Sequence, residues 1–169
     1  MSIIDTIAKT VSSRPAKKTG DMDILDKLQQ EHDEAKALLK QLVEGESARD
    51  RKATLKKLKS ALVPHLRAEE KVVYDAVLAL KDKQIKQDGE EGYLEHELGD
   101  RMLATLGKIA NAMSPEFSAA AKVLKELVEH HVEEEESNIW AAVRDNFSSE
   151  DRIEMNRKFE AAKKKVRIP

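Results

Sequence analysis

The chain contains no cysteine, few aromatic residues and no long apolar segment. The absence of cysteine excludes disulfides, iron–sulfur clusters, thiolate zinc sites and cysteine nucleophiles. An aromatic content of 4% is low for a β-sandwich, and together with 40% hydrophobic and 37% charged residues it favours an α-helical protein. No apolar run approaches the roughly 20 residues that cross a membrane as a helix, so we expect no membrane span.

The charge of the chain is nearly balanced, with a formal net charge of -2. It gives no electrostatic reason to expect a nucleic acid as a partner. The length of 169 residues suits one domain with a sizeable core. Residues 1–21 lack the apolar stretch and cleavage site of a secretory signal, so we expect an N-terminal arm and linker on a cytoplasmic protein. The sequence carries no signal of oligomeric state.

Apolar residues at steps of three and four predict four long amphipathic helices, over about 23–44, 48–81, 90–113 and from 114 onward. Each helix would turn one stripe of side chains towards a shared core. The stripes are Leu25, Leu28, His32, Ala35, Leu39 and Leu42; Leu55, Leu58, Leu62, His65, Glu69, Val72 and Ala76; His96, Gly99, Leu103, Leu106 and Ala110; and Phe117, Ala121, Leu124, Val128, His131, Glu135 and Ala142.

Local signals refine these limits. Ser114 and Pro115 are suited to the cap and the first position of the fourth helix. Pro64 lies inside the second helix and predicts a kink or local distortion. A last helix is predicted to start at Ser148, before a basic tail. The sequence thus predicts an all-α protein: an up-down-up-down four-helix bundle over 22–147, preceded by the arm (1–21) and followed by a C-terminal helix and tail (148–169).

Polar side chains interrupt all four stripes. Four of the five histidines lie on them, one per helix, and two of these are followed four residues later by a glutamate on the same face. A single histidine on an apolar face is usually a hydrogen-bonded core residue, and His130 with Glu134 has the same spacing. Two buried carboxylates among four imidazoles, however, need a compensating charge, which a metal ion supplies. The candidate ligands are His32, His65, Glu69, His96, His131 and Glu135.

The two histidine–glutamate pairs lie in an internal repeat. When "HLRAEEKVVYDAV" from His65 is aligned with "HVEEEESNIWAAV" from His131, the histidine and both glutamates coincide and Tyr74 matches Trp140. An "EH" dipeptide precedes each copy, at 31–32 and at 95–96. The chain therefore reads as two copies of a helix pair, each of which contributes one histidine and one His-x3-Glu.

The donor set favours two metal ions over one. Mixed imidazole and carboxylate ligands suit iron, manganese or zinc. Four imidazoles and two bridging carboxylates form about eight bonds, whereas two octahedral ions need about twelve. A bridging oxo or hydroxo group, water and an exogenous ligand would complete the set. A single tetrahedral zinc ion would leave two histidines unused.

This order of residues resembles the hemerythrin-like family, the HHE cation-binding domains, whose motif is H…HxxxE…H…HxxxE. The resemblance covers about residues 22–145. It implies a four-helix bundle with an oxo- or hydroxo-bridged, non-haem di-iron centre, in which Glu69 and Glu135 bridge and the histidines of each half are further ligands. It also implies a diatomic ligand such as O2 or NO, or a role in iron handling, sensing or nitric-oxide stress.

One feature departs from the oxygen-carrying members of that family, which have five histidine ligands. The fifth histidine here, His130, is adjacent to His131 and thus about 100° away around the helix. Gly92 and Gly99 flank His96, which indicates either a small pocket or close helix packing. The candidates for a further ligand are Tyr93, Glu31, Glu34, Glu70 and His130, while Glu70 and Glu136 also fit a solvated or supporting role.

Two functions remain open at this point: a ligand-binding or iron-handling protein, and a di-iron enzyme with oxidase, peroxidase-like or NO-reducing activity. A ferritin-type site is disfavoured because no Glu-x-x-His spacing occurs. A haem bundle would leave two histidines and both glutamates unexplained. A plain helical interaction module fails on the same residues.

Overall fold

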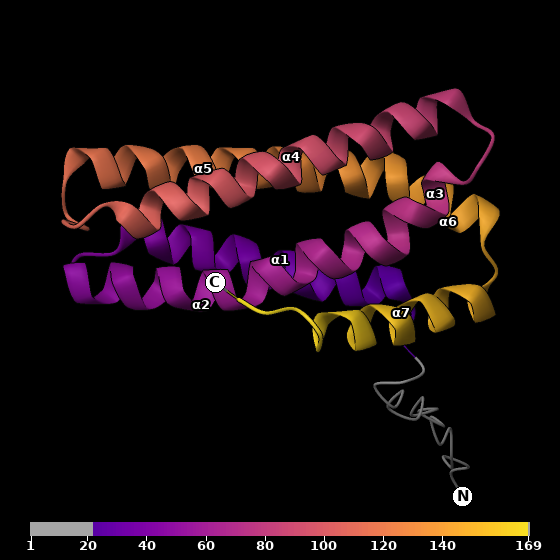
Figure 1. Ribbon diagram of the computed structural model, residues 1–169, viewed down its shortest axis with the longest axis horizontal. Coiled ribbons are helices and arrows are strands. Elements are labelled where there is room, and N and C mark those ends of the chain that lie inside the picture. The colour runs from indigo at the N-terminus through magenta and orange to yellow at the C-terminus, as the bar shows by residue number, and fades with distance from the viewer. Residues whose placement is uncertain (1–21, 169) are drawn as a thin grey trace, which may run out of the picture.

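The computed structural model describes residues 22–168, and this part of the chain is helical without any strand. The arm predicted over 1–21 lies outside it. Four long helical segments alternate in direction, and a further helix lies along one side (Figure 1). The elements are α1 (Ile24–Glu44), α2 (Ala48–Glu69), η2 (Glu70–Tyr74), α3 (Asp75–Leu78), α4 (Lys83–Lys108), α5 (Pro115–Glu134), η3 (Glu135–Ile139), α6 (Trp140–Asn146) and α7 (Ser149–Lys163). The predicted all-α bundle with an additional C-terminal helix is confirmed.

The helix starts follow the capping chemistry of the sequence. The Ser114 hydroxyl accepts the N–H of Phe117 at 3.1 Å and caps α5. Ser148 forms a reciprocal capping box with Asp151 at the start of α7. The predicted starts at these two serines are confirmed. α2 continues as a helix through Pro64, and its second half is inclined to its first in Figure 1, as a missing backbone donor would allow.

The core consists of two apolar clusters with a polar layer between them. One cluster contains side chains from α1, α2, α4 and α5, including Leu39, Leu58 and Phe117. The other contains Leu28 of α1 and Phe159 of α7. Along α1, His32 lies between Leu28 of one cluster and Ala35 of the other. The histidine–glutamate layer is therefore sealed on both sides by apolar side chains.

Two π-helical turns lie at the ends of the two His-x3-Glu pairs: η2 starts one residue after Glu69, and η3 starts at Glu135 itself. A π turn inserts one residue into the helical repeat. The prediction that Val72 and Ala76 lie on the buried stripe is accordingly wrong: Val73 and Val77 are fully buried, and Val72 and Ala76 are half-buried. After η3, Val143 is buried together with the predicted Ala142.

The limits of α4 also differ from the prediction. α4 starts earlier, at Lys83, because the Asp82 carboxylate accepts the N–H groups of Gln84 and Ile85 and caps the helix there. It ends at Lys108, since Ile109 is extended. Ala110 therefore lies beyond the helix and is exposed, not on a buried stripe.

α7 packs against α1, α2 and η2, and thus against the first half of the bundle. Phe159 is its fully buried anchor. Within residues 22–168, no helix is both long enough and apolar enough to cross a membrane.

Candidate metal centre

All six candidate ligands are buried and converge in the polar layer. Every imidazole turns its Nε2 atom towards a glutamate of the layer. Each of these four N–O distances is too long for a strong hydrogen bond but suits two donors facing a shared ion. They join His32 to Glu135 at 3.4 Å, His65 to Glu69 at 3.5 Å, His96 to Glu69 at 3.4 Å and His131 to Glu135 at 3.6 Å.

The donor atoms form two overlapping groups, each close enough to surround one ion. His32, His65 and Glu69 make up the first, and Glu69, His96 and His131 the second. Glu69 belongs to both. The two histidines of one half of the chain thus lie together, and a carboxylate lies between the two pairs.

Five of the buried donor atoms have no hydrogen-bond partner among residues 22–168. His32 Nε2 and all four carboxylate oxygens of Glu69 and Glu135 lack a hydrogen bond. Burial of an unpaired carboxylate is costly, and proteins satisfy such groups with hydrogen bonds, ion pairs or metals. A cation between these atoms would supply the missing interaction to all of them, so the donor set fits metal ions.

The two buried carboxyl groups have pKa values that shift in opposite directions. Burial raises the pKa of Glu135 well above its ordinary value, and the neighbouring Glu69 carboxylate raises it further. Burial acts in the same direction on Glu69, but His65 and His96 together outweigh it and lower its pKa. The surrounding side chains thus favour the charged form of Glu69 and the neutral form of Glu135.

Each histidine of the layer has a second glutamate on its outer nitrogen, Nδ1. Histidines that bind metals usually donate this other N–H to a carboxylate, which fixes the ring and leaves Nε2 for the ion. The pairs are Glu31 with His65 at 3.0 Å, Glu95 with His131 at 2.7 Å, Glu70 with His96 at 3.1 Å and Glu136 with His32 at 3.1 Å.

These four acids follow the internal repeat. Two come from the "EH" dipeptides and bind the histidine of their own half, whereas two are the second residues of the trailing "EE" pairs and bind the histidine of the other half. The sequence already contained this signal in its matching dipeptides. What it could not show is that Glu70 and Glu136 cross between the halves.

Comparison with known proteins agrees with this geometry. The model of the family described as "Hemerythrin HHE cation binding domain" matches residues 23–143. This chain belongs to the hemerythrin HHE family. A curated protein from Nostoc sp. (strain PCC 7120), named "DNA nickase", is 30% identical over 146 residues, which are 86% of this chain and 40% of that protein. The HHE chain thus spans less than half the length of this relative. No solved structure matches it.

None of the candidates for a further ligand reaches the Nε2 side of this HHE centre. Glu31 and Glu70 occupy the outer nitrogens. The Tyr93 hydroxyl lies 3.0 Å from the Glu70 carbonyl oxygen and from the Asp75 carboxylate. Glu34 is exposed. The side chain of His130 is 60% exposed and points away from the layer.

The two aromatic side chains of the repeat, Tyr74 and Trp140, each pack against a histidine of the opposite half. Tyr74 of the first half lies against His96, with ring centroids 5.3 Å apart. Trp140 of the second half stacks on His32 at 5.7 Å and 19°. Each aromatic ring thus holds the histidine of the opposite half in place.

The two glycines beside His96 have different roles. A Cβ atom at Gly92 would lie 2.5 Å from the Tyr74 hydroxyl oxygen, so only glycine lets this ring fit. A Cβ atom at Gly99 would meet nothing within 4 Å. Gly99 borders a cavity of about 20 Å³ that the four histidines also line. Such a cavity admits a species of about the size of a water molecule.

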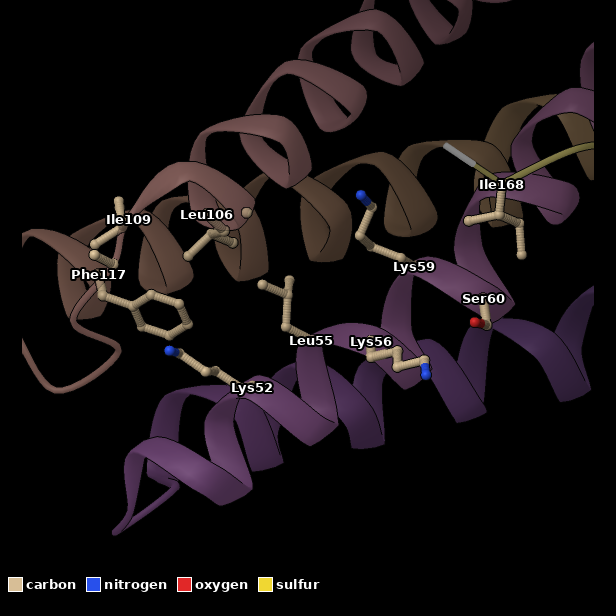
Figure 2. Close-up of a pocket in the computed structure, with 11 residues that line it drawn as sticks. Lys52, Leu55, Lys56, Lys59, Ser60, Leu106, Ile109, Phe117 and Ile168 are labelled. Atoms are coloured by element: carbon tan, nitrogen blue, oxygen red, sulfur yellow. The ribbon is translucent and has the colours of Figure 1, made fainter.

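A larger hollow lies elsewhere on the HHE domain (Figure 2). It measures about 640 Å³ and is lined by Leu55, Phe117 and three lysines, Lys52, Lys56 and Lys59. None of the candidate ligands borders it. This hollow is therefore separate from the metal centre.

α7 covers the centre on one side only. Phe159 lies edge-on against His65, with ring centroids 5.8 Å apart. Lys163 pairs with Glu31, the acid that holds His65. Lys27 contacts the same carboxylate at 2.9 Å. The two halves of the HHE domain are therefore alike in their buried layer and different at its outer edge.

Proposed function

We propose that this HHE domain binds two iron ions in its buried histidine–glutamate layer. The two buried histidines of each half would hold one ion, and Glu69 and Glu135 would lie between the ions, where each can bridge. The observation that carries this proposal is the set of buried carboxylate oxygens without hydrogen-bond partners, faced by four imidazole nitrogens. Manganese or zinc could be held by the same donors.

The function we infer is the binding of a diatomic ligand such as O2 or NO, or the handling or sensing of iron. When bound, two iron ions supply a site at which such a ligand can be coordinated or reduced. The cavity beside the histidines, of about 20 Å³, supports a very small ligand and leaves no room for an organic substrate. The alternative is a di-iron enzyme of the oxidase, peroxidase-like or NO-reducing kind.

The remaining side chains of the layer would prepare the site for that role. The four outer glutamates hold the imidazole rings so that Nε2 faces inwards. The apolar clusters on both sides exclude water and strengthen electrostatic attraction within the layer.

Metal analysis tests the first part of this proposal. Protein expressed with iron should contain about two iron ions per chain, from the ligand count above, and Glu69→Gln and Glu135→Gln should lose them. Glu133→Gln, an exposed acid on the same helical segment, serves as the control. One zinc ion per chain, or no metal, would contradict the di-iron proposal.

The reduced, iron-loaded protein mixed with O2 separates the two functions. A spectral change that reverses under vacuum would support a carrier or sensor. Immediate and irreversible oxidation would support the enzyme.

The relative named "DNA nickase" suggests a separate test. A DNA phosphodiester does not fit the cavity beside the histidines, so we infer that this centre does not cleave DNA. Supercoiled plasmid incubated with the iron-loaded chain should stay intact. Nicking that disappears in Glu69→Gln would contradict this inference.

A further inference from the structure

A second group of metal-ligating side chains lies on the surface beside the centre. It consists of Glu95 on α4 and of His130 and Glu134 on α5, and we call it the outer triad. His130 Nε2 lies 3.8 Å from Glu95 Oε1 and 3.5 Å from Glu134 Oε1. The three donor atoms lie within 4.8 Å of one another, close enough to share one ion.

The outer triad connects directly to the buried layer through Glu95. One oxygen of this carboxylate faces His130 at the surface, and the other lies 2.7 Å from His131 Nδ1. Glu95 also borders the cavity that the four histidines line. A chain of ligand atoms therefore runs from the exposed His130 to the buried His131 without a break.

The first half of the chain has buried apolar residues at the positions that match His130 and Glu134. In the alignment of the two halves, His130 corresponds to Pro64 and Glu134 to Ala68, and both of these are buried. No metal-ligating side chain is present at either position, and α7 packs on this side of α2. The repeat thus has ligands at the second-half edge where the first half has apolar residues.

The charged side chains near Glu31 in the first half and near Glu95 in the second half also differ in sign. Glu31, the counterpart of Glu95, contacts Lys27 at 2.9 Å and Lys163. The position that Lys27 holds in the first half is occupied by Glu91 in the second, where it is exposed. A cation that approaches the first-half edge meets two ammonium groups, whereas one that approaches the second-half edge meets carboxylates.

We propose that the outer triad is a surface site for a divalent transition-metal ion and the route by which metal enters the centre. This inference rests on the proposed function, because it needs a buried centre to supply. His130 and Glu134 would capture the ion, and Glu95 would pass it towards His131. Imidazole with two carboxylates suits Fe2+, Mn2+ or Zn2+.

The fluorescence of Trp140 can report the arrival of metal in the centre. Trp140 is its only tryptophan, and it stacks on His32 within the centre. Fe2+ added anaerobically to the metal-free protein should therefore quench its fluorescence when the ion reaches the buried layer. The rate of quenching measures entry, and the iron content at the end measures the centre itself.

The decisive comparison is between single variants of the exposed face. His130→Asn and Glu134→Gln should slow the quenching by about tenfold, the lower end of what electrostatic focusing supplies, and should reach the same final iron content as the wild type. Glu133→Gln removes an equal charge from the next residue and should load at the wild-type rate. All three positions are on the surface of α5, so the variants should fold, which circular dichroism checks.

The outcomes separate the route from the centre. Equal loading rates in His130→Asn, Glu134→Gln and Glu133→Gln would overturn the route and leave the di-iron centre standing. A wild-type protein that takes up no iron would overturn both.

Discussion

The carboxylate of Glu70 lies 3.1 Å from the Nδ1 atom of His96, a histidine from the other half of the chain. Its neighbour Glu69 faces the opposite side of the same ring, 3.4 Å from Nε2. Two adjacent glutamates therefore contact one imidazole at its two nitrogens. The inner one is placed to bind metal and the outer one to fix the ring.

Removal of the outer charge should weaken metal binding without abolishing it. Glu70→Gln keeps the size of the side chain but loses the charge that orients His96, so metal affinity should fall about 10- to 100-fold. Competition with a chelator measures this change. Glu97→Gln, whose carboxylate pairs only with the exposed Arg101 among the described residues, should bind like the wild type, and an equal loss in both variants would contradict the role of Glu70.

The two bridging candidates should differ in the metal-free protein. Burial and the charge of Glu69 raise the pKa of Glu135 well above its ordinary value, which favours the neutral carboxyl group. A neutral amide should therefore replace it at little cost, and Glu135→Gln should change the free energy of unfolding by less than about 1 kcal/mol. Glu69 is charged and paired with His65 and His96, so Glu69→Gln should cost about 3–5 kcal/mol.

Urea unfolding of metal-free samples measures both values. Both variants should lose metal to the same extent. Their difference in the free energy of unfolding therefore arises in the metal-free centre. A large destabilisation by Glu135→Gln would mean that its carboxyl group is charged in the metal-free protein.

The two glycines of α4 should respond oppositely to alanine. Gly92→Ala forces a methyl group into the Tyr74 hydroxyl, which is buried and cannot move away, so we expect a loss of about 1–3 kcal/mol. Gly99→Ala meets open space and should gain about 0.5–1 kcal/mol from helix propensity. Thermal unfolding compares them. Destabilisation by Gly99→Ala would show that the space beside it is filled.

Metal affinity should rise with pH. Burial alone would lower the pKa of His65, but Glu69 and Glu31 raise it to about 9. An incoming ion must displace this proton, so affinity should increase about tenfold per pH unit for each proton released, and should level off above about pH 9.

The stability of the metal-free protein should change in the other direction. Because the pKa of His65 is raised from its ordinary 6.5 to about 9 on folding, its contribution is complete below pH 6.5 and is lost as the pH rises towards 9. Chelator competition and unfolding measured across this range check both trends. Parallel trends would show that His65 is not protonated in the empty site.

The sequence predicted the four long helices and the six buried donors because both depend on periodicity along a single helix. It misplaced Val72 and Ala76 because a π turn leaves no pattern in the residues it displaces. It predicted α7 as a helix but not where this helix docks, since α7 is mostly polar and has few buried side chains, chiefly Phe159. Pairings such as Glu70 with His96 depend on how the two halves face each other, which no local pattern contains.

The crosswise contacts of Glu70 and Glu136 affect how this protein can open. The first helix hairpin is α1 and α2 with η2, and the second is α4 and α5 with η3. Each hairpin supplies a carboxylate to a histidine of the other, and Glu69 lies between the two histidine pairs. Neither hairpin can separate without breaking contacts of both. Amide hydrogen exchange should therefore find that bound metal merges the two hairpins into one cooperative unit, whose protection everywhere equals that of global unfolding.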